Sequence, residues 1–329
     1  MCFFVAMLYS VSYKTRQFLL LLVKLSIVIG MAYFVYHRLT NNQRLDIDIF
    51  WETIQNNRVF HVNNILVLLL LSALNWILEG LKWKALTASL KRISFKDAME
   101  QSLGALTASL LTPNRIGEYG AKVVYYSKNH RKKVLFLNLW SNMLQMSVTI
   151  ILGAIGLYFF LSHFEVAIDY YRILRSVAIL IAIVVAGLFG LRHRRLQIKG
   201  FSFQKIKEFV QKMTLRLHIQ AWALSLLRYA TFSFQFFFLL QMFGITLTYF
   251  EAMMLITSMY LIASLVPTVF IFDVVIRGGA AVWLFGFMQI NELTILCITS
   301  LMWLLNFVLP SVFGSYYVLN FNAWKTDNE

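Results

Sequence analysis

Charged residues are scarce in this chain, and their scarcity excludes a large soluble protein. They make up 14% of the 329 residues, whereas hydrophobic residues make up 59% and the mean hydropathy is +0.67. Soluble domains carry about 25% charged residues. A chain with this composition is typical of an integral membrane protein that crosses the bilayer several times.

Cysteine is scarce, and histidine clusters and catalytic motifs are absent. Cys2 and Cys297 lie far apart, so no disulfide framework is indicated, and the six histidines are too scattered to predict a metal site. No zinc-protease, serine-hydrolase, Walker A or dinucleotide-binding motif occurs. We therefore expect no metal and no cofactor, and we expect a non-enzymatic activity rather than catalysis.

The net charge of +15 comes from basic residues in short loops between apolar runs. Lys and Arg gather in 82–96, 122–133 and 192–216, while 162–171 and 245–251 contain neither. Basic loops face the cytoplasm. This pattern predicts a membrane orientation with both termini cytoplasmic, and it argues against nucleic-acid binding.

Apolar runs long enough to cross a bilayer predict an all-α fold. A span needs about 20 mostly apolar residues, and no Pro- or Ser-rich linker separates the runs, so we expect one transmembrane domain over residues 1–329. Six continuous spans are predicted, at about 17–37, 62–83, 134–161, 172–191, 217–244 and 291–319.

Two further apolar stretches, 98–126 and 250–288, are each interrupted by a proline. Both flanks of the first are basic and its incoming helix is too short to span, which predicts a re-entrant hairpin. A kinked full span, giving eight spans in all, is the alternative. The pattern of spans and hairpin repeats in halves 17–161 and 172–319, and three full spans per half make the repeats inverted.

The first interruption carries charged residues. Pro113 stops the incoming helix and Gly117 permits a tight turn. Asn114 and Arg115 follow the proline, and Glu118 opens the next helix. Charges at a break inside the bilayer are costly, so we predict that Arg115 and Glu118 bind substrate. An ion pair that only fixes the hairpin tip is the alternative.

The second interruption repeats this arrangement. Pro267 breaks the apolar run, and Asp273 and Arg277 follow four residues apart, which places them on one helix face. Gly278 and Gly279 allow close approach of a helix or a ligand. We predict that Asp273 and Arg277 bind substrate, with a purely structural ion pair as the alternative.

A few charges also lie inside or near continuous spans. Glu79 either contacts a lysine at the interface or lines the path of the substrate, and Arg228, deep in its span, faces a headgroup cavity or packs structurally. Lys122 is expected at the interface. A helical stripe is expected to join helices rather than bind a ligand; it consists of Asn138, Asn142 and Gln145.

At its two proline segments the chain resembles the transmembrane region of bacterial lysylphosphatidylglycerol synthases, a flippase-like family. The first motif, a proline followed by Gly-Glu, is matched by Pro113, Gly117 and Glu118, and the second by Pro267, Arg277 and Gly278. The stretch 75–84 is similar as well. We expect no aminoacyl-transferase domain after the last span, so the resemblance implies only the half that translocates lipid.

These observations lead to one expected function and two alternatives. We expect a flippase-like protein of the bacterial inner membrane that moves an anionic or glycosylated lipid, phospho- or polyprenyl-linked, between leaflets. Its partners would be membrane lipids. The alternatives are a membrane-embedded transferase acting on a lipid-linked substrate, and an accessory subunit that partners a lipid-modifying enzyme.

Overall fold

The computed structural model describes Gln55, Thr112, Phe209, Gln211 and residues 59–109, 116–165, 213–265 and 270–320. All of these belong to one compact unit, Glu52–Glu329. The predicted spans 17–37 and 172–191 lie outside the described residues, so a single domain over residues 1–329 stays a prediction. Four predicted site residues lie outside as well: Pro113, Asn114, Arg115 and Pro267.

Four helices of the described residues are long and apolar enough to cross a membrane. They are α4 (Val62–Thr87), α7 (Arg131–His163), α10 (Leu215–Met242) and a continuous helix made of α13 (Glu292–Trp303), the π-helical turn η2 (Leu304–Val308) and α14 (Leu309–Leu319). They confirm the spans predicted at 62–83, 134–161, 217–244 and 291–319. The chain is therefore a multi-pass membrane protein with an all-helical fold in the part that the structure describes.

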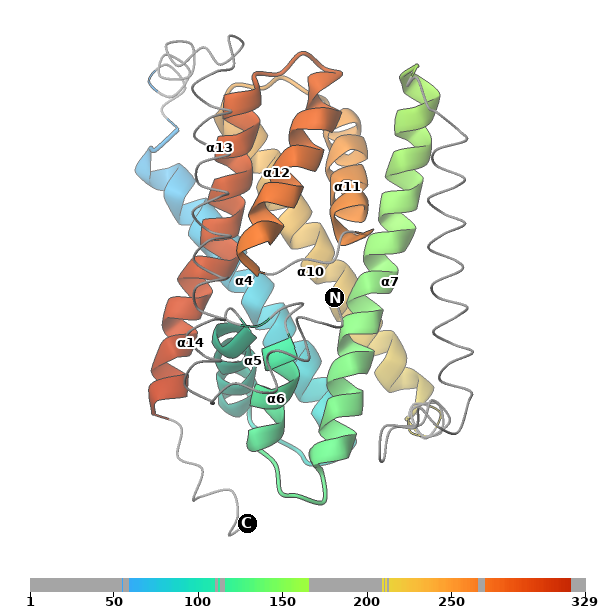
Figure 1. Cartoon of the computed structure of the whole chain (residues 1–329), viewed down its shortest axis with the longest axis vertical. Helices are drawn as coiled ribbons and strands as arrows, with labels where there is room; N and C mark the ends of the chain where they lie inside the picture. The colour runs from blue at the N-terminus through green and yellow to red at the C-terminus, as the bar shows by residue number, and fades with distance from the viewer. Residues whose placement is uncertain are drawn as a thin grey trace, which may run out of the picture. The chain divides into compact units, whose positions relative to one another are not determined.

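The two proline-interrupted stretches form helix pairs. The first hairpin is α5 (Phe95–Ser109) packed on α6 (Ile116–Val124), and the second is α11 (Tyr249–Leu265) packed on α12 (Phe270–Gly286). Even the 17 residues of α11 reach only about 25 Å at 1.5 Å per residue, less than the ~30 Å hydrocarbon core. Figure 1 shows the hairpins at opposite ends of the long helices. The hairpin prediction is confirmed, and the kinked-span alternative is wrong.

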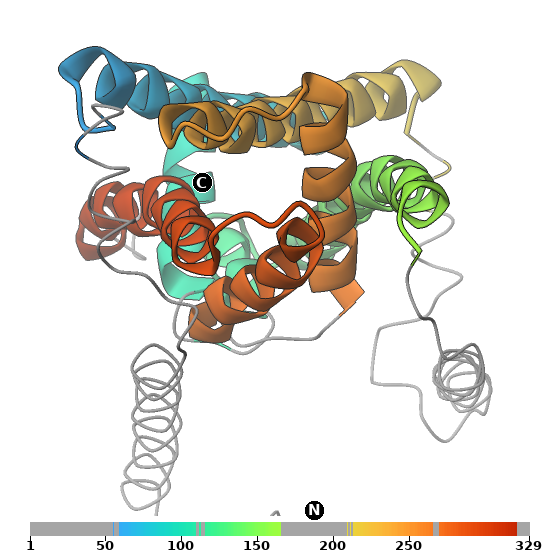
Figure 2. The same ribbon diagram turned by 90° about the horizontal axis from the view of Figure 1, so that it is seen from above.

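Each hairpin packs against the last span of the other half. Helix α5 packs on α14, α11 packs on α7, and α4 packs on α10. Figure 2 shows α4 and α10 along one side, with α12 and α13 across from them. The exchange of packing partners is thus the same for both hairpins, and the inverted repeat itself stays a prediction.

Small residues permit these exchanged contacts. A Cβ atom at Gly314 of α14 would collide with the backbone carbonyl oxygen of Leu103 in α5, and one at Gly156 of α7 would collide with the Thr257 hydroxyl in α11. The Thr107 hydroxyl also donates to the Ser311 carbonyl across the first contact, at 2.9 Å. Glycine therefore lets the helices approach closely at both contacts.

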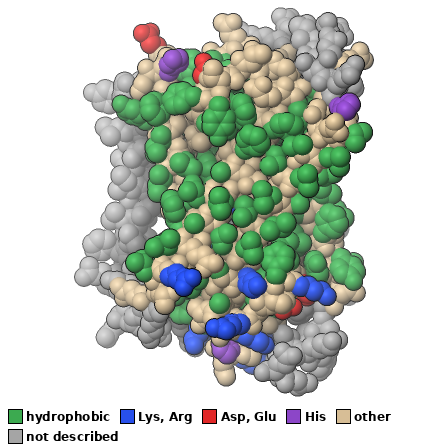
Figure 3. Space-filling model, turned by 180° about the vertical axis from the view of Figure 1, so that it is seen from behind, with side chains coloured by type: hydrophobic (Ala, Val, Ile, Leu, Met, Phe, Trp, Pro, Cys, Tyr) green, Lys and Arg blue, Asp and Glu red, His purple; other side chains and the backbone are tan. Residues whose placement is uncertain are grey.

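The surface separates into an apolar belt and one basic end (Figure 3). Large hydrophobic side chains are exposed along the long helices, among them Leu70 of α4, Ile150 of α7 and Phe313 of α14. Lys and Arg gather at one end in Figure 3, where α4 ends and α7 and α10 begin. The described loops at the other end, 243–248 and 287–291, contain neither residue. This asymmetry is the one that the sequence predicts.

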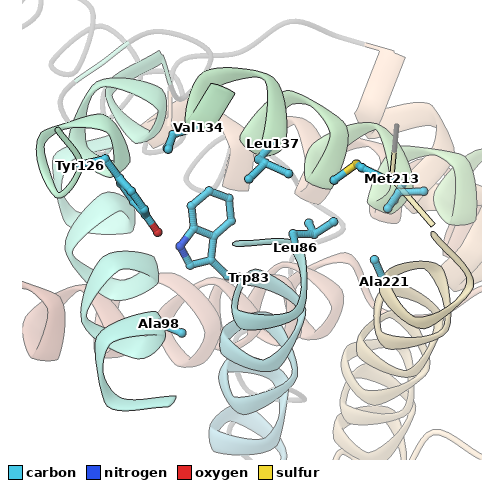
Figure 4. Close-up of a cluster of buried hydrophobic side chains, with 9 residues drawn as sticks. Trp83, Leu86, Ala98, Tyr126, Val134, Leu137, Met213 and Ala221 are labelled. Atoms are coloured by element: carbon cyan, nitrogen blue, oxygen red, sulfur yellow. The ribbon is translucent and has the colours of Figure 1, made fainter. Parts of the chain in front are cut away.

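A buried cluster holds the elements together at the basic end (Figure 4). The indole of Trp83 in α4 lies at its centre and donates to Gln101 Oε1 of α5 at 2.8 Å. The hydroxyl of Tyr126 donates to the same oxygen at 2.9 Å. Leu137 of α7 and Ala221 of α10 close the cluster. The first hairpin is thereby anchored to three spans.

Candidate functional site

A cavity of about 310 Å³ lies where the long helices and both hairpins meet, and we call it the central cavity. Its polar lining includes Asn75 of α4, Gln145 of α7, Arg228 of α10 and Asn306 of η2. Each of these residues lies near the middle of its span. The central cavity is therefore at mid-membrane depth, where an isolated polar group is costly and usually functional.

Pro310 shapes the wall of the central cavity. Proline has no backbone N–H and cannot bond the carbonyl four residues earlier, which is that of Asn306. The helix widens into the π-turn η2 just before it. The Trp76 indole donates to the Asn306 carbonyl at 3.0 Å, and the Ser72 hydroxyl donates to the Leu305 carbonyl. Helix α4 thus satisfies the carbonyls that the widened turn releases.

The Asn306 side chain joins three spans through amide hydrogen bonds. Its Nδ2 donates to Gln235 Oε1 of α10 at 2.8 Å, and its Oδ1 accepts from Asn75 Nδ2 of α4 at the same distance. Gln235 in turn donates to the Leu68 carbonyl at 3.0 Å. These partners fix the orientation of each amide, and Asn75 is left with its oxygen directed toward Arg228.

Arg228 connects the central cavity to a buried carboxylate. Its Nε donates to Asn75 Oδ1 at 2.9 Å and its Nη1 to Glu79 Oε2 at 2.7 Å. Glu79 Oε2 also lies 2.8 Å from Lys82 Nζ, and the Lys82 side chain is only 1% exposed. We call Glu79, Lys82 and Arg228 the buried triad. It contains one carboxylate and two cations.

Glu118 forms a second buried ion pair beneath the cavity wall. Glu118 lies in the first turn of α6 and lines the central cavity. Lys122 Nζ donates to Glu118 Oε1 at 3.0 Å and to Asn138 Oδ1 of α7 at 2.8 Å. The same ammonium lies 4.1 Å from the ring centroid of Trp83, a cation–π contact. The Glu118 carboxylate therefore lines the cavity, whereas the Lys122 ammonium that pairs with it is buried behind the cavity wall.

Asp273 and Arg277 form the most accessible ion pair of the central cavity. Arg277 Nε lies 2.9 Å from Asp273 Oδ2, one turn apart on α12, and their side chains are 30% and 21% exposed. The guanidinium also lies over the rings of Tyr260 and Phe307, at 5.6 and 5.5 Å from their centroids. The aromatic rings hold Arg277 in place while part of it faces the cavity.

Two arginines and two carboxylates line the central cavity, namely Arg228 and Arg277 and Glu118 and Asp273. Lys82, Lys122 and Glu79 are buried behind them, so the described groups in and beside the cavity are four basic and three acidic side chains. Helices α6 and α12 also begin at the inner ends of their hairpins, so their positive dipole ends face inward. An anionic group is the ligand that this arrangement favours.

The structure brings together the described members of the predicted site. Glu118, Arg228, Asp273 and Arg277 all line the central cavity. Glu79 borders an adjacent polar cavity of about 20 Å³ and bonds Arg228. Whether these residues bind a substrate stays a prediction. In the described part of the chain no group of three or more His, Cys, Asp or Glu could hold a metal ion.

Some predictions about single residues need correction. Lys122 is not interfacial but 1% exposed, because α6 folds back against Trp83 and Asn138. Glu79 does contact a lysine, but the contact is buried rather than at the interface. Two stripe residues that were expected only to join helices also line the central cavity, namely Asn142 and Gln145.

The glycines of the two motifs differ in their roles. Gly117 lies within the first turn of α6 and allows close approach to the Ala108 carbonyl, so it serves packing rather than a tight turn. Gly278 is buried, and a Cβ there would lie 3.0 Å from Leu296 of α13. A Cβ at Gly279 would meet no atom of another described element within 4 Å, so close approach of a helix is not its role.

The sequence did not predict the hydrogen-bonded amides of Asn75, Gln235 and Asn306. It also did not predict the contact between the ring of Tyr260 and Arg277. A signal was present. Pro310 is the third proline of the chain, and Asn306 lies one turn before it in an apolar span. A proline with an amide one turn earlier predicts an opened helix whose carbonyls need outside donors.

Comparison with known proteins gives one match. The family model described as the lysylphosphatidylglycerol synthase TM region matches residues 21–314, nearly the whole chain. No curated protein and no solved structure matches.

Proposed function

Because the chain belongs to the family of the lysylphosphatidylglycerol synthase TM region, we propose that it moves the headgroup of an anionic phospholipid between the two leaflets. The family indicates a lipid-related, flippase-like function in the membrane. The anionic class of the lipid and the route through the central cavity are our own assignment. They rest on the charge and the position of that cavity.

The proposal rests mainly on two arginines, Arg228 and Arg277, that line a polar cavity at mid-membrane depth. The central cavity, at about 310 Å³, is near the lower limit of the ~300–1,000 Å³ typical of small-molecule sites. That space suits a headgroup but not the acyl chains, which would remain in the surrounding lipid. Arg277 and Arg228 would contact the phosphate, since a guanidinium matches its geometry.

The two hairpins provide a means of opening the cavity to either side. They approach it from opposite ends of the long helices, and each packs on the last span of the other half. Rocking of one hairpin against its span would expose the cavity to one leaflet at a time. We place the basic end in the cytoplasm of a bacterial inner membrane, with both termini on that side.

Lipid movement in reconstituted vesicles tests the proposal. Fluorescent phosphatidylglycerol in phosphatidylcholine vesicles would be followed by quenching of the label in the outer leaflet. Arg228→Gln and Arg277→Gln should slow its movement about tenfold to a hundredfold, since a hydrogen bond to a charged group contributes about 1.5–3 kcal/mol. Arg216→Gln, at an exposed position on the helix that carries Arg228, is the matched control and should behave as wild type.

The outcomes separate the rival functions. Unchanged lipid movement in both arginine variants would refute the role of the central cavity. A product of altered mass after incubation with a lipid extract would identify a transferase instead. If variants neutral at Glu118, Arg228, Asp273 and Arg277 all retained full function when correctly folded, the accessory role would replace ours.

A further inference from the structure

The buried triad carries one positive charge more than it can balance. Glu79 Oε2 lies 2.8 Å from Lys82 Nζ and 2.7 Å from Arg228 Nη1, so one carboxylate serves two cations. The side chains of Lys82, Glu79 and Arg228 are 1%, 8% and 16% exposed. A buried charge without a partner is strongly unfavourable, and a protein avoids it by neutralising a group.

The neighbouring described groups do not supply the missing negative charge. The charged groups that act on Lys82 are Glu79 on its own helix, Arg228 on α10 and Lys122 on α6. Lys122 is itself matched by Glu118, 3.0 Å away. The remaining carboxylate of the central cavity, Asp273, is paired with Arg277.

Only one of the two cations of the buried triad can lose its charge readily. Arginine stays protonated in proteins, whereas a buried lysine ammonium can release its proton. Arg228 moreover donates to both Asn75 and Glu79, which holds its guanidinium in place. Lys82 has Glu79 as its ion-pair partner and sits deeper in the protein.

We propose that Lys82 is a proton-exchange site whose occupancy follows the binding of an anionic headgroup in the central cavity. The inference rests on the proposed function and adds a coupling ion to it. With the cavity empty, Lys82 is neutral and Glu79 balances Arg228. When a phosphate binds at Arg228, its negative charge compensates the guanidinium, and Lys82 accepts one proton from water to become the partner of Glu79.

A small polar cavity provides a place for the water that carries this proton. It measures about 20 Å³, which exceeds the ~10–15 Å³ that one water requires. Glu79, Glu118 and Arg228 line it, so it joins the buried triad to residues of the central cavity. Ser102 also lines it, and the Ser102 hydroxyl is buried without a hydrogen-bond partner. A water at this position would satisfy that hydroxyl and reach Glu79.

The exchange couples two fluxes. One proton binds for each anionic headgroup, so the two would cross the membrane together and a proton gradient would drive the lipid. The coupling is reciprocal: protonation strengthens headgroup binding as much as headgroup binding strengthens protonation. Lipid movement should therefore be faster at mildly acidic pH than at mildly alkaline pH, on the order of tenfold.

Proton uptake measured in detergent tests the inference without requiring transport. Short-chain dihexanoyl phosphatidylglycerol would be added to the purified full chain in weak buffer containing a pH-sensitive dye. Wild type should take up close to one proton per bound lipid. Lys82→Arg, which is permanently charged, and Lys82→Met, which is permanently neutral, should take up none. Lys84→Met is the matched control, because Lys84 is exposed on the same helix, and it should match wild type.

Vesicles give the second measurement. Lys82→Arg should move fluorescent phosphatidylglycerol at the acidic rate of wild type at every pH, and Lys82→Met at its alkaline rate. Lipid binding by wild type without proton uptake would overturn the inference, as would an unchanged pH dependence in Lys82→Arg. Lipid movement that is independent of pH would refute the proton exchange alone, whereas a complete lack of lipid movement would refute the proposed function.

Discussion

Removing Glu79 and removing Lys82 should have very different effects on stability, although each change breaks the same 2.8 Å ion pair. Glu79→Gln leaves Lys82 and Arg228 buried with no carboxylate between them. Breaking a buried pair in this way costs about 3–5 kcal/mol. Lys82→Met leaves Glu79 paired with Arg228 at 2.7 Å, so no charge is uncompensated and the change should cost about 1 kcal/mol or less.

The difference is measurable as an apparent melting temperature in detergent, read by size-exclusion chromatography after heating. A shift of about 2–4 °C per kcal/mol predicts a fall of roughly 6–20 °C for Glu79→Gln. Lys82→Met should shift the melting temperature by only a few degrees, and the double variant should keep most of the Glu79→Gln loss because Arg228 is still buried without a carboxylate. Glu165→Gln, at an exposed position, is the control. Equal falls in melting temperature for both single variants would refute the conclusion that the buried triad has one cation too many.

Two further predictions concern packing and orientation. Gly314→Ala should lower the melting temperature because its Cβ would meet the Leu103 carbonyl. Gly279→Ala should not lower it, because there is open space at that position and alanine has the better helix propensity. Equal effects of the two changes would contradict the close α5–α14 contact. In a background without Cys2 and Cys297, a membrane-impermeant maleimide added to intact cells should label Ser162→Cys but not Lys132→Cys, and the reverse result would invert the proposed orientation.

The long helices and hairpins were predictable because they depend on local properties. Apolar length predicts the spans, and a proline between short apolar helices with basic flanks predicts the first hairpin. The charges Glu118, Arg228, Asp273 and Arg277 could also be singled out, since a charge in an apolar run is rare. Local reasoning therefore identified residues that line the central cavity without knowing their partners.

The partners depend on tertiary structure and could not be predicted in the same way. Arg228 meets Glu79 across 149 positions of the chain, and Asn75 meets Asn306 across 231. Lys122 illustrates the error that follows: it looks interfacial in sequence because a basic loop follows α6. The backward fold of α6 places it against Trp83 instead. The direction of a short helix depends on its tertiary packing, and a local sequence pattern does not predict that packing.

The exchanged contacts between halves impose an order on biogenesis. The hydrogen bond from Thr107 to Ser311 joins residues 204 positions apart, so α5 is made long before its packing partner α14. At about 5–20 residues per second, a ribosome needs roughly 10–40 s to complete the intervening chain. During that interval α5 lacks its partner helix, so its face that later packs against Gly314 of α14 is open to other contacts.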